Sequence, residues 1–224
     1  MYVHEWGRRD DVPLVFWHAL GADASGAELR EVAPVLADAG FHVLAVDGPG
    51  FGRSPALSAE RYRLAALAEL LGELIDEREF ERPVLMGHSW GGAIVVKYAG
   101  ARPDDVRALV LLDSGHIDYG ALPGTAAQLA ASPPSDAGSM ARHGLADPVS
   151  DAWPAIAAHE IPTLLFLATL PPHVDQNREH IGRFESAIPH ADVRWPANAG
   201  HGLLADIGPP LGDEIAGWLV EQGL

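Results

Sequence analysis

The 224-residue sequence contains no cysteine. That absence excludes a disulfide scaffold, a thiol nucleophile and a cysteine-ligated zinc site. Basic residues are few, with 15 Lys and Arg against 31 Asp and Glu, which gives a formal net charge of −16. Nucleic acids and anionic membrane surfaces would repel such a chain. We therefore expect no nucleic-acid partner and no membrane partner.

Long apolar runs are also missing, since none approaches the roughly 18 residues of a membrane-spanning helix. Residues 1–9 lack the charged-then-apolar order of a secretory signal, so a cytoplasmic protein is expected. Hydrophobic residues make up 48% of the chain and charged residues 21%, a balance that favours a well-packed core. We expect one domain over residues 1–224, as a monomer or homodimer.

Short apolar runs alternate with amphipathic stretches along the chain. This alternation predicts an α/β fold, with a mostly parallel central sheet covered by helices on both faces. Apolar stripes at helical spacing predict helices within 29–36, 64–74, 181–188 and 211–219. The predicted strands are 14–17, 42–46, 84–86, 108–112 and 163–168, with a weaker one at 191–195 and an antiparallel edge at 2–6.

The segment from about 114 to 160 breaks this rhythm. It is rich in Ala, Gly, Pro and Ser and holds no strong strand, although good strands precede and follow it. We interpret it as a short lid inserted into the domain over a pocket. A plain surface connection is the alternative.

A Gly-His-Ser-Trp-Gly-Gly motif occupies residues 87–92, between an apolar run and a helix-like stretch. A serine held on a sharp strand-to-helix turn needs small neighbours, and Gly87 and Gly91 stand on either side of Ser89. Such a turn presents the hydroxyl at the N-terminus of the next helix, where developing negative charge is stabilised. Ser89 is therefore the predicted nucleophile.

With this motif in place, the chain resembles the α/β-hydrolase superfamily over nearly its whole length. The resemblance implies an oxyanion hole made by two backbone amides, those of Leu20 and Trp90. The sequence departs from the family at Ala19, where glycine is usual. We interpret His18 as a buried structural histidine.

Residues 47–54, Asp-Gly-Pro-Gly-Phe-Gly-Arg-Ser, resemble the loop that follows the next strand in this family. They lack the pattern of a phosphate-binding or dinucleotide-binding loop. We interpret Asp47 and Arg53 as a structural anchor for this loop.

His201 is the predicted general base among the eleven histidines. It stands in an Asn-Ala-Gly-His-Gly segment after the last predicted strand and before the terminal helix, where the family carries its catalytic histidine. Its imidazole would take the Ser89 proton during attack and return it to the leaving group.

The acid of the triad is harder to place, because its commonest family position, after strand 163–168, holds no acidic residue. Asp175 lies several residues later. Asp113 directly follows strand 108–112, a position that resembles the acid site of haloalkane dehalogenases and of the lactone hydrolase acting on zearalenone. Carboxyl ends of parallel strands meet at one edge, so Asp113 can reach the same imidazole. We predict Asp113, with Asp175 as the main alternative and Asp118 as a third candidate.

Metal chemistry has weaker support. His173, Asp175 and His180 could form a cation site, and so could segment 114–118, but neither shows ligand spacing of the His-Glu-x-x-His kind. We expect neither a metal nor an organic cofactor.

These residues together predict a serine hydrolase that cleaves a carboxylic ester or a lactone of a small, largely apolar substrate through an acyl-enzyme. A carbon–carbon bond hydrolase or a cofactor-free perhydrolase would use the same triad. The alternative from another class is a ligand-binding or receptor-like protein that keeps the fold with little turnover.

Overall fold

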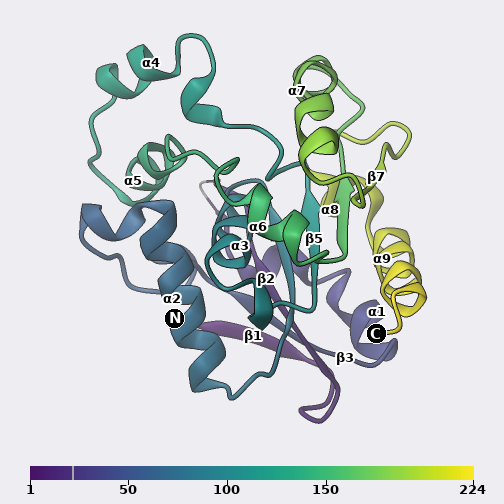
Figure 1. The fold of residues 1–224 in the computed structure, drawn as a ribbon. Coiled ribbons are helices and arrows are strands. Elements are labelled where there is room, and N and C mark those ends of the chain that lie inside the picture. The colour runs from purple at the N-terminus through teal and green to yellow at the C-terminus, as the bar shows by residue number, and fades with distance from the viewer. Residues whose placement is uncertain (22) are drawn as a thin grey trace.

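A computed structural model describes residues 1–21 and 23–224. In these residues a seven-stranded sheet has the order β1-β3-β2-β4-β5-β6-β7, and only β1 is antiparallel to its neighbour (Figure 1). The strands are β1 (Val3–Trp6), β2 (Val12–Trp17), β3 (Phe41–Val46), β4 (Val84–His88), β5 (Ala108–Leu112), β6 (Thr163–Phe166) and β7 (Asp192–Arg194). The predicted α/β class, the parallel sheet and the antiparallel edge are confirmed.

The sheet is buried on both faces, which explains why its strands are continuous apolar runs. Every residue of β3, β4 and β5 is buried. Along β2 the side chains alternate, since Val15 and Trp17 enter one core layer whereas Leu14 and Phe16 enter the other.

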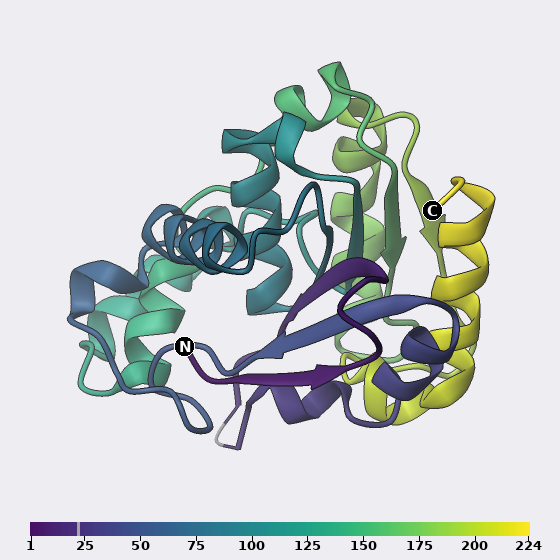
Figure 2. The same ribbon diagram turned by 90° about the horizontal axis from the view of Figure 1, so that it is seen from below.

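Helices cover each face of the sheet, and Figures 1 and 2 show the two layers from directions 90° apart. One layer contains α1 (Ala33–Asp38), α8 (Leu203–Ile207) and α9 (Pro209–Glu221). The other contains α2 (Leu64–Glu77), α3 (Trp90–Ala101), α6 (Trp153–Ala158) and α7 (His173–Ala187). Short 3₁₀ turns are η1 (Gly26–Leu29), η2 (Ala59–Tyr62), η3 (Pro103–Asp105) and η4 (Tyr119–Ala121). No helix in the described ranges is long and apolar enough to cross a membrane.

The segment predicted as an insertion contains two short helices that stand apart from the sheet, α4 (Thr125–Ala131) and α5 (Ala137–Gly144) (Figure 1). No residue of α4 is buried. Helix α5 packs against η2, where a Cβ added to Gly144 would lie 2.0 Å from the carbonyl oxygen of Tyr62. At the C-terminal end of the 114–160 segment, α6 packs into the core layer through the buried Trp153 and Ile156.

The turn between β4 and α3 brings backbones into direct contact. A Cβ added to Gly91 would lie 2.0 Å from the carbonyl oxygen of Trp17, and one added to Gly87 would lie 2.5 Å from the backbone of Gly91. Strand β2 therefore sits against the first turn of α3 with no space for a side chain.

This contact predicts that Gly91→Ala destabilises the protein, whereas a Gly→Ala change at an open helical position should stabilise it. Gly91→Ala should lower the free energy of unfolding by about 2 kcal/mol or more, since the clashing atom belongs to the backbone. Gly217→Ala in α9, where an added Cβ meets no atom within 4 Å, should raise it by roughly 0.5–1 kcal/mol through helix propensity. Urea unfolding of both variants measures the difference, and equal stability of the two would contradict the close approach.

Candidate active site

Ser89 occupies the turn between β4 and α3 in a backbone conformation that L-residues rarely adopt, with φ +52° and ψ −112°. Two contacts to the neighbouring strand hold it there. Its amide donates to the carbonyl oxygen of Leu112 at 3.1 Å, and the hydroxyl of Ser114 donates to its carbonyl oxygen. The surrounding sheet thus fixes a strained residue at the carboxyl edge, as is common at functional sites.

His201 lies in the loop between β7 and α8, and its ring is part-buried. Its Nδ1 donates a hydrogen bond of 2.6 Å to Oδ2 of Asp113, across 88 residues of sequence. The structure therefore brings the predicted base and the predicted acid into direct contact.

Asp113 directly follows β5 and has a positive φ of +45°. Its second carboxylate oxygen, Oδ1, accepts from the amide of Ala168 at 2.9 Å and from Nδ2 of Asn177 at 2.6 Å. Burial acts to raise the pKa of Asp113. The hydrogen bonds from His201, Ala168 and Asn177 outweigh burial, so the pKa is lowered from its ordinary value of 3.8 and the group stays a carboxylate at neutral pH.

Asn177 is the main site residue that sequence reasoning missed. It lies on the inward face of α7, where Val174, Asn177, Ile181 and Phe184 recur at helical spacing. Its Oδ1 accepts from Nε2 of the buried His116 at 2.9 Å, while its Nδ2 donates to Asp113. A polar residue inside an otherwise apolar stripe was the available signal.

The two alternative acids have other surroundings. Asp175 is exposed in the first turn of α7, while His201 Nδ1 is bonded to Asp113. Asp118 accepts from the amides of Val149 and Ser150 at 2.8 and 2.9 Å, and from Arg183 at 3.1 Å. Asp118 therefore fastens the chain after α5 to α7.

The oxyanion-hole candidates lie beside the serine. Trp90 is the first residue of α3, and its side chain is buried against Trp17, His18 and Phe51 with ring centroids 5.3–5.7 Å apart. Leu20 is part-buried and lines the same pocket as Ser89. An amide at a helix N-terminus suits a developing negative charge.

His18 and Asp47 hold neighbouring loops in place. The amide of Gly48 donates to His18 Nε2 at 2.9 Å, so Nδ1 carries the proton and donates to the carbonyl of Ala19 at 2.6 Å. Asp47 accepts from the amides of Gly26 and Arg53, both at 2.8 Å. The Arg53 guanidinium instead donates to the Tyr2 hydroxyl, so only its backbone contacts Asp47.

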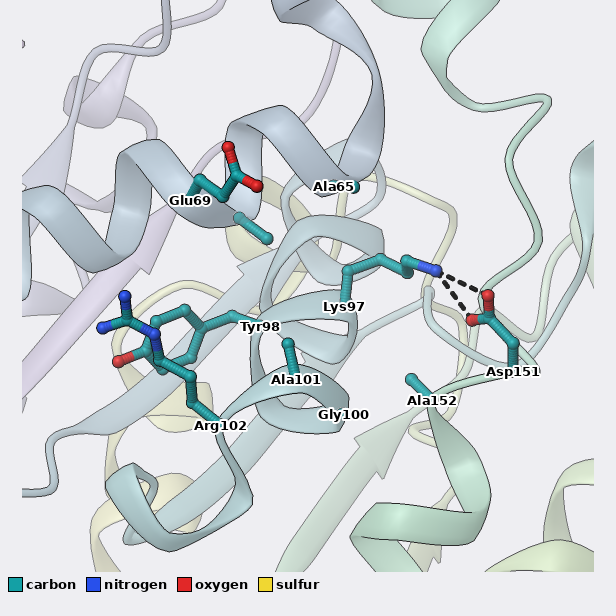
Figure 3. A pocket seen from close by; sticks show the side chains of 10 residues that line it. Ala65, Glu69, Lys97, Tyr98, Gly100, Ala101, Arg102, Asp151 and Ala152 are labelled. Carbon is teal, nitrogen blue, oxygen red and sulfur yellow. Dashed lines mark hydrogen bonds and ion pairs between the residues drawn. The ribbon is translucent and has the colours of Figure 1, made fainter.

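A pocket of about 880 Å³ opens over Ser89 and His201. Tyr119 and three residues of α5, Ala137, Gly138 and Arg142, line it from the inserted segment. A second pocket, of about 340 Å³, lies on the outer side of α2 and α3, where Lys97 Nζ donates to both carboxylate oxygens of Asp151 at 2.7 Å (Figure 3). None of the predicted catalytic residues lines that second pocket.

His173 is a further histidine of the first pocket. Its ring stacks on that of His201 with centroids 4.4 Å apart and planes 10° apart, and its Nδ1 lies 3.8 Å from Asp113 Oδ2. Burial and the neighbouring His201 lower the pKa of His173, so it is neutral at pH 7. It therefore adds an uncharged polar wall beside the candidate base.

Asp113, His173 and His201 are close enough to raise the question of a metal ion, with one ligand atom from each within 4.8 Å of the others. Their geometry fits a cation poorly. Asp113 Oδ2 and His201 Nδ1 already bond to each other, and parallel stacked imidazoles direct their lone pairs side by side and not toward one point. Among the described residues, His173 therefore groups with Asp113 and His201, and not with Asp175 and His180 as the sequence suggested.

Comparison with known proteins agrees with this geometry. The family model described as alpha/beta hydrolase fold matches residues 12–205, and the chain belongs to that family. Over 104 residues it is 38% identical to a 2-hydroxy-6-oxononadienedioate/2-hydroxy-6-oxononatrienedioate hydrolase of Cupriavidus pinatubonensis, which covers 46% of this chain and 36% of that protein. The matched part of the chain covers less than half of the length of these curated relatives, for example 36% of a putative non-heme haloperoxidase of Mycobacterium phage D29.

Solved structures share the fold over nearly the whole chain. An esterase from Thermogutta terrifontis has a TM-score of 0.78 at 19% identity and covers 98% of this chain and 93% of its own. A bromoperoxidase from Bacillus anthracis has a TM-score of 0.76 at 20% identity and covers 97% and 94%. At such identities the likeness concerns the fold alone.

The contact between Asn177 and Asp113 predicts a pH-dependent stability. A carboxylate with a lowered folded-state pKa stabilises the protein above its unfolded pKa, and that contribution is lost as pH falls through the folded pKa. Asn177→Ala should cost about 1–3 kcal/mol at pH 7, and the cost should fall as the pH drops through the lowered pKa of Asp113 and the carboxylate becomes protonated. Chemical denaturation at several pH values measures this, with the neighbouring Gln176→Ala as control; a cost independent of pH would contradict it.

Proposed function

We propose that the protein is a serine hydrolase that cleaves a carboxylic ester or lactone through an acyl-enzyme. One observation carries the proposal. Asp113 bonds His201 Nδ1 at 2.6 Å, and the ring of His201 lines the same pocket as the strained Ser89. These observations support a Ser-His-Asp triad, with Ser89 as nucleophile, His201 as base and Asp113 as orienting acid.

In the proposed reaction, Ser89 Oγ attacks the acyl carbon while its proton passes to Nε2 of His201. The backbone amides of Leu20 and Trp90 donate to the oxyanion, and the Asp113 carboxylate stabilises the imidazolium. The bond to the leaving oxygen then breaks as His201 returns the proton to that oxygen. Water attacks the acyl-enzyme in the same way, releases the acid and restores the Ser89 hydroxyl.

The pocket supports a small, largely apolar substrate. Leu20, Phe51, Tyr119 and Leu145 contribute apolar or aromatic surface around Ser89. Helix α5 forms part of the wall, which supports the interpretation of the α4–α5 segment as a lid. A substrate would contact both the sheet edge and this segment.

Hydrolysis of a carbon–carbon bond is the second candidate, because a relative named as a 2-hydroxy-6-oxononadienedioate hydrolase is 38% identical over the matched part. The same serine, histidine and acid would serve. A set of p-nitrophenyl esters of rising chain length, assayed beside lactones and vinylogous diketones, separates the two reactions.

The role of Ser89 is tested with a fluorophosphonate probe, which reacts with activated serines. The wild-type protein should be labelled and Ser89→Ala should not, because the only nucleophile in the proposed site is gone. Ser186→Ala, which removes an exposed serine of α7 that does not line this pocket, is expected to retain labelling. Absence of labelling in the folded wild-type protein would favour a ligand-binding protein instead of an enzyme.

The role of Asp113 is tested by isosteric replacement. Asp113→Asn should lower kcat by roughly 10⁴, because an amide favours the wrong tautomer of His201. Asp175→Asn serves as the matched control and should stay within about twofold of the wild-type rate, since an exposed group makes only small contributions. A large loss in Asp175→Asn with little change in Asp113→Asn would reverse the assignment.

A further inference from the structure

His88 is the last residue of β4 and immediately precedes Ser89, yet its side chain is buried, at 2% exposure, and does not line the pocket over Ser89. Both ring nitrogens have close oxygen neighbours. Nδ1 lies 2.5 Å from Oε1 of Glu28, and Nε2 lies 2.6 Å from the backbone carbonyl oxygen of His201. Carboxylate and carbonyl oxygens only accept, so both nitrogens must donate. His88 is therefore an imidazolium.

Glu28 supplies the counter-charge from η1. Its other oxygen, Oε2, accepts from the amide of Ala19 at 3.0 Å, next to the oxyanion-hole candidate Leu20. One ion pair, between the buried His88 and the part-buried Glu28, thus connects three loops of the site. These are the turn that carries Ser89, the loop that carries His201 and the loop that carries Leu20.

The groups that face His88 favour its charged form overall. Burial lowers the pKa of His88, but the hydrogen bond and charge of Glu28, the His201 carbonyl and the Asp113 carboxylate outweigh burial and raise it above 6.5. Burial acts to raise the pKa of Glu28, but the contacts with His88 and Ala19 outweigh burial and lower it. The rings of His18 and His201 also approach, the latter with centroids 5.0 Å apart. Burial lowers the pKa of His18, which favours its uncharged form.

We infer that Glu28 is a positioning residue, which keeps His88 doubly protonated so that His88 ties the backbone of His201 to the turn of Ser89. The inference rests on the proposed function, since it assigns Ser89 and His201 their catalytic roles. Glu28 itself does not line the pocket over Ser89. Its effect should therefore fall on the reaction rate and not on substrate binding.

The physical reason lies in the charge on the ring. Without the charge of Glu28, the buried His88 would lose one proton, and its hydrogen bond to the His201 carbonyl oxygen would no longer be charge-assisted. Charge-assisted hydrogen bonds are roughly twice as strong as neutral ones, so the His201 loop would be held less firmly. Small displacements of a catalytic group reduce rates strongly even when the changed residue lies outside the reacting atoms.

The test uses Glu28→Gln, which keeps the size and hydrogen-bonding capacity of the side chain but removes its charge. The matched control is Glu31→Gln, a nearby exposed acid whose side chain is 61% accessible. Kinetics with a p-nitrophenyl ester should show kcat lowered by roughly ten- to a hundredfold in Glu28→Gln, with KM within about twofold of wild type. Glu31→Gln should match the wild type in both constants.

Nitrogen-15 NMR of the histidine rings gives a readout that a merely structural role would not move. In the wild-type protein both nitrogens of His88 should remain protonated at a pH where an unperturbed histidine has lost its proton, assigned by loss of the signals in His88→Gln. In Glu28→Gln only one should remain protonated at that pH. A neutral His88 in the wild type, or an unchanged kcat in folded Glu28→Gln, would overturn the inference.

Glu28→Asp covers the case in which Glu28→Gln does not fold. Glu28→Asp retains the charge and should keep His88 doubly protonated. Its loss of kcat should be smaller than that of Glu28→Ala, which removes the charge. A loss in Glu28→Asp equal to that in Glu28→Ala would show that shape, and not charge, matters, and would overturn the proposed role. Failure of the wild type to react with a fluorophosphonate would instead remove the proposed function, and the positioning role with it, whatever the NMR signals of His88.

Discussion

The 2.6 Å hydrogen bond between His201 and Asp113 joins residues that are 88 positions apart, and only the parallel sheet makes that contact possible. Strands β4, β5, β6 and β7 run in the same direction, so their carboxyl ends meet at one edge. Ser89 follows β4, Asp113 follows β5 and the His201 loop follows β7. The order of the strands therefore determines which side chains can share a proton.

Much of this arrangement is readable from the sequence because it depends on local patterns. Buried parallel strands are short apolar runs, and the glycines around Ser89 report a turn that admits no side chain. Asp113 could be preferred over Asp175 because it directly follows a strand. The structure supports that preference through contacts the sequence does not contain, namely the amide of Ala168 and the side chain of Asn177.

The parts that escaped sequence reasoning depend on distant contacts. Asn177 and His173 lie on α7, and no local pattern states that this helix begins beside His201. The pairing of His88 with Glu28 joins positions 60 residues apart, and neither residue has a distinctive neighbourhood in sequence. Helix α6 is short and Ala-rich, so its burial against α7 has little periodic signal in the sequence.

The position of Asp113 has a consequence for the loop between β6 and α7. That loop is the commonest place for the family's acid, but here residues 169–172 hold none, and the chain reaches His173 on the pocket wall instead. The Thr169 hydroxyl donates to the carbonyl oxygen of Pro196 and accepts from the amide of Ala199, in the segment that leads to His201. The strand end that carries no acid therefore still holds the histidine loop in place.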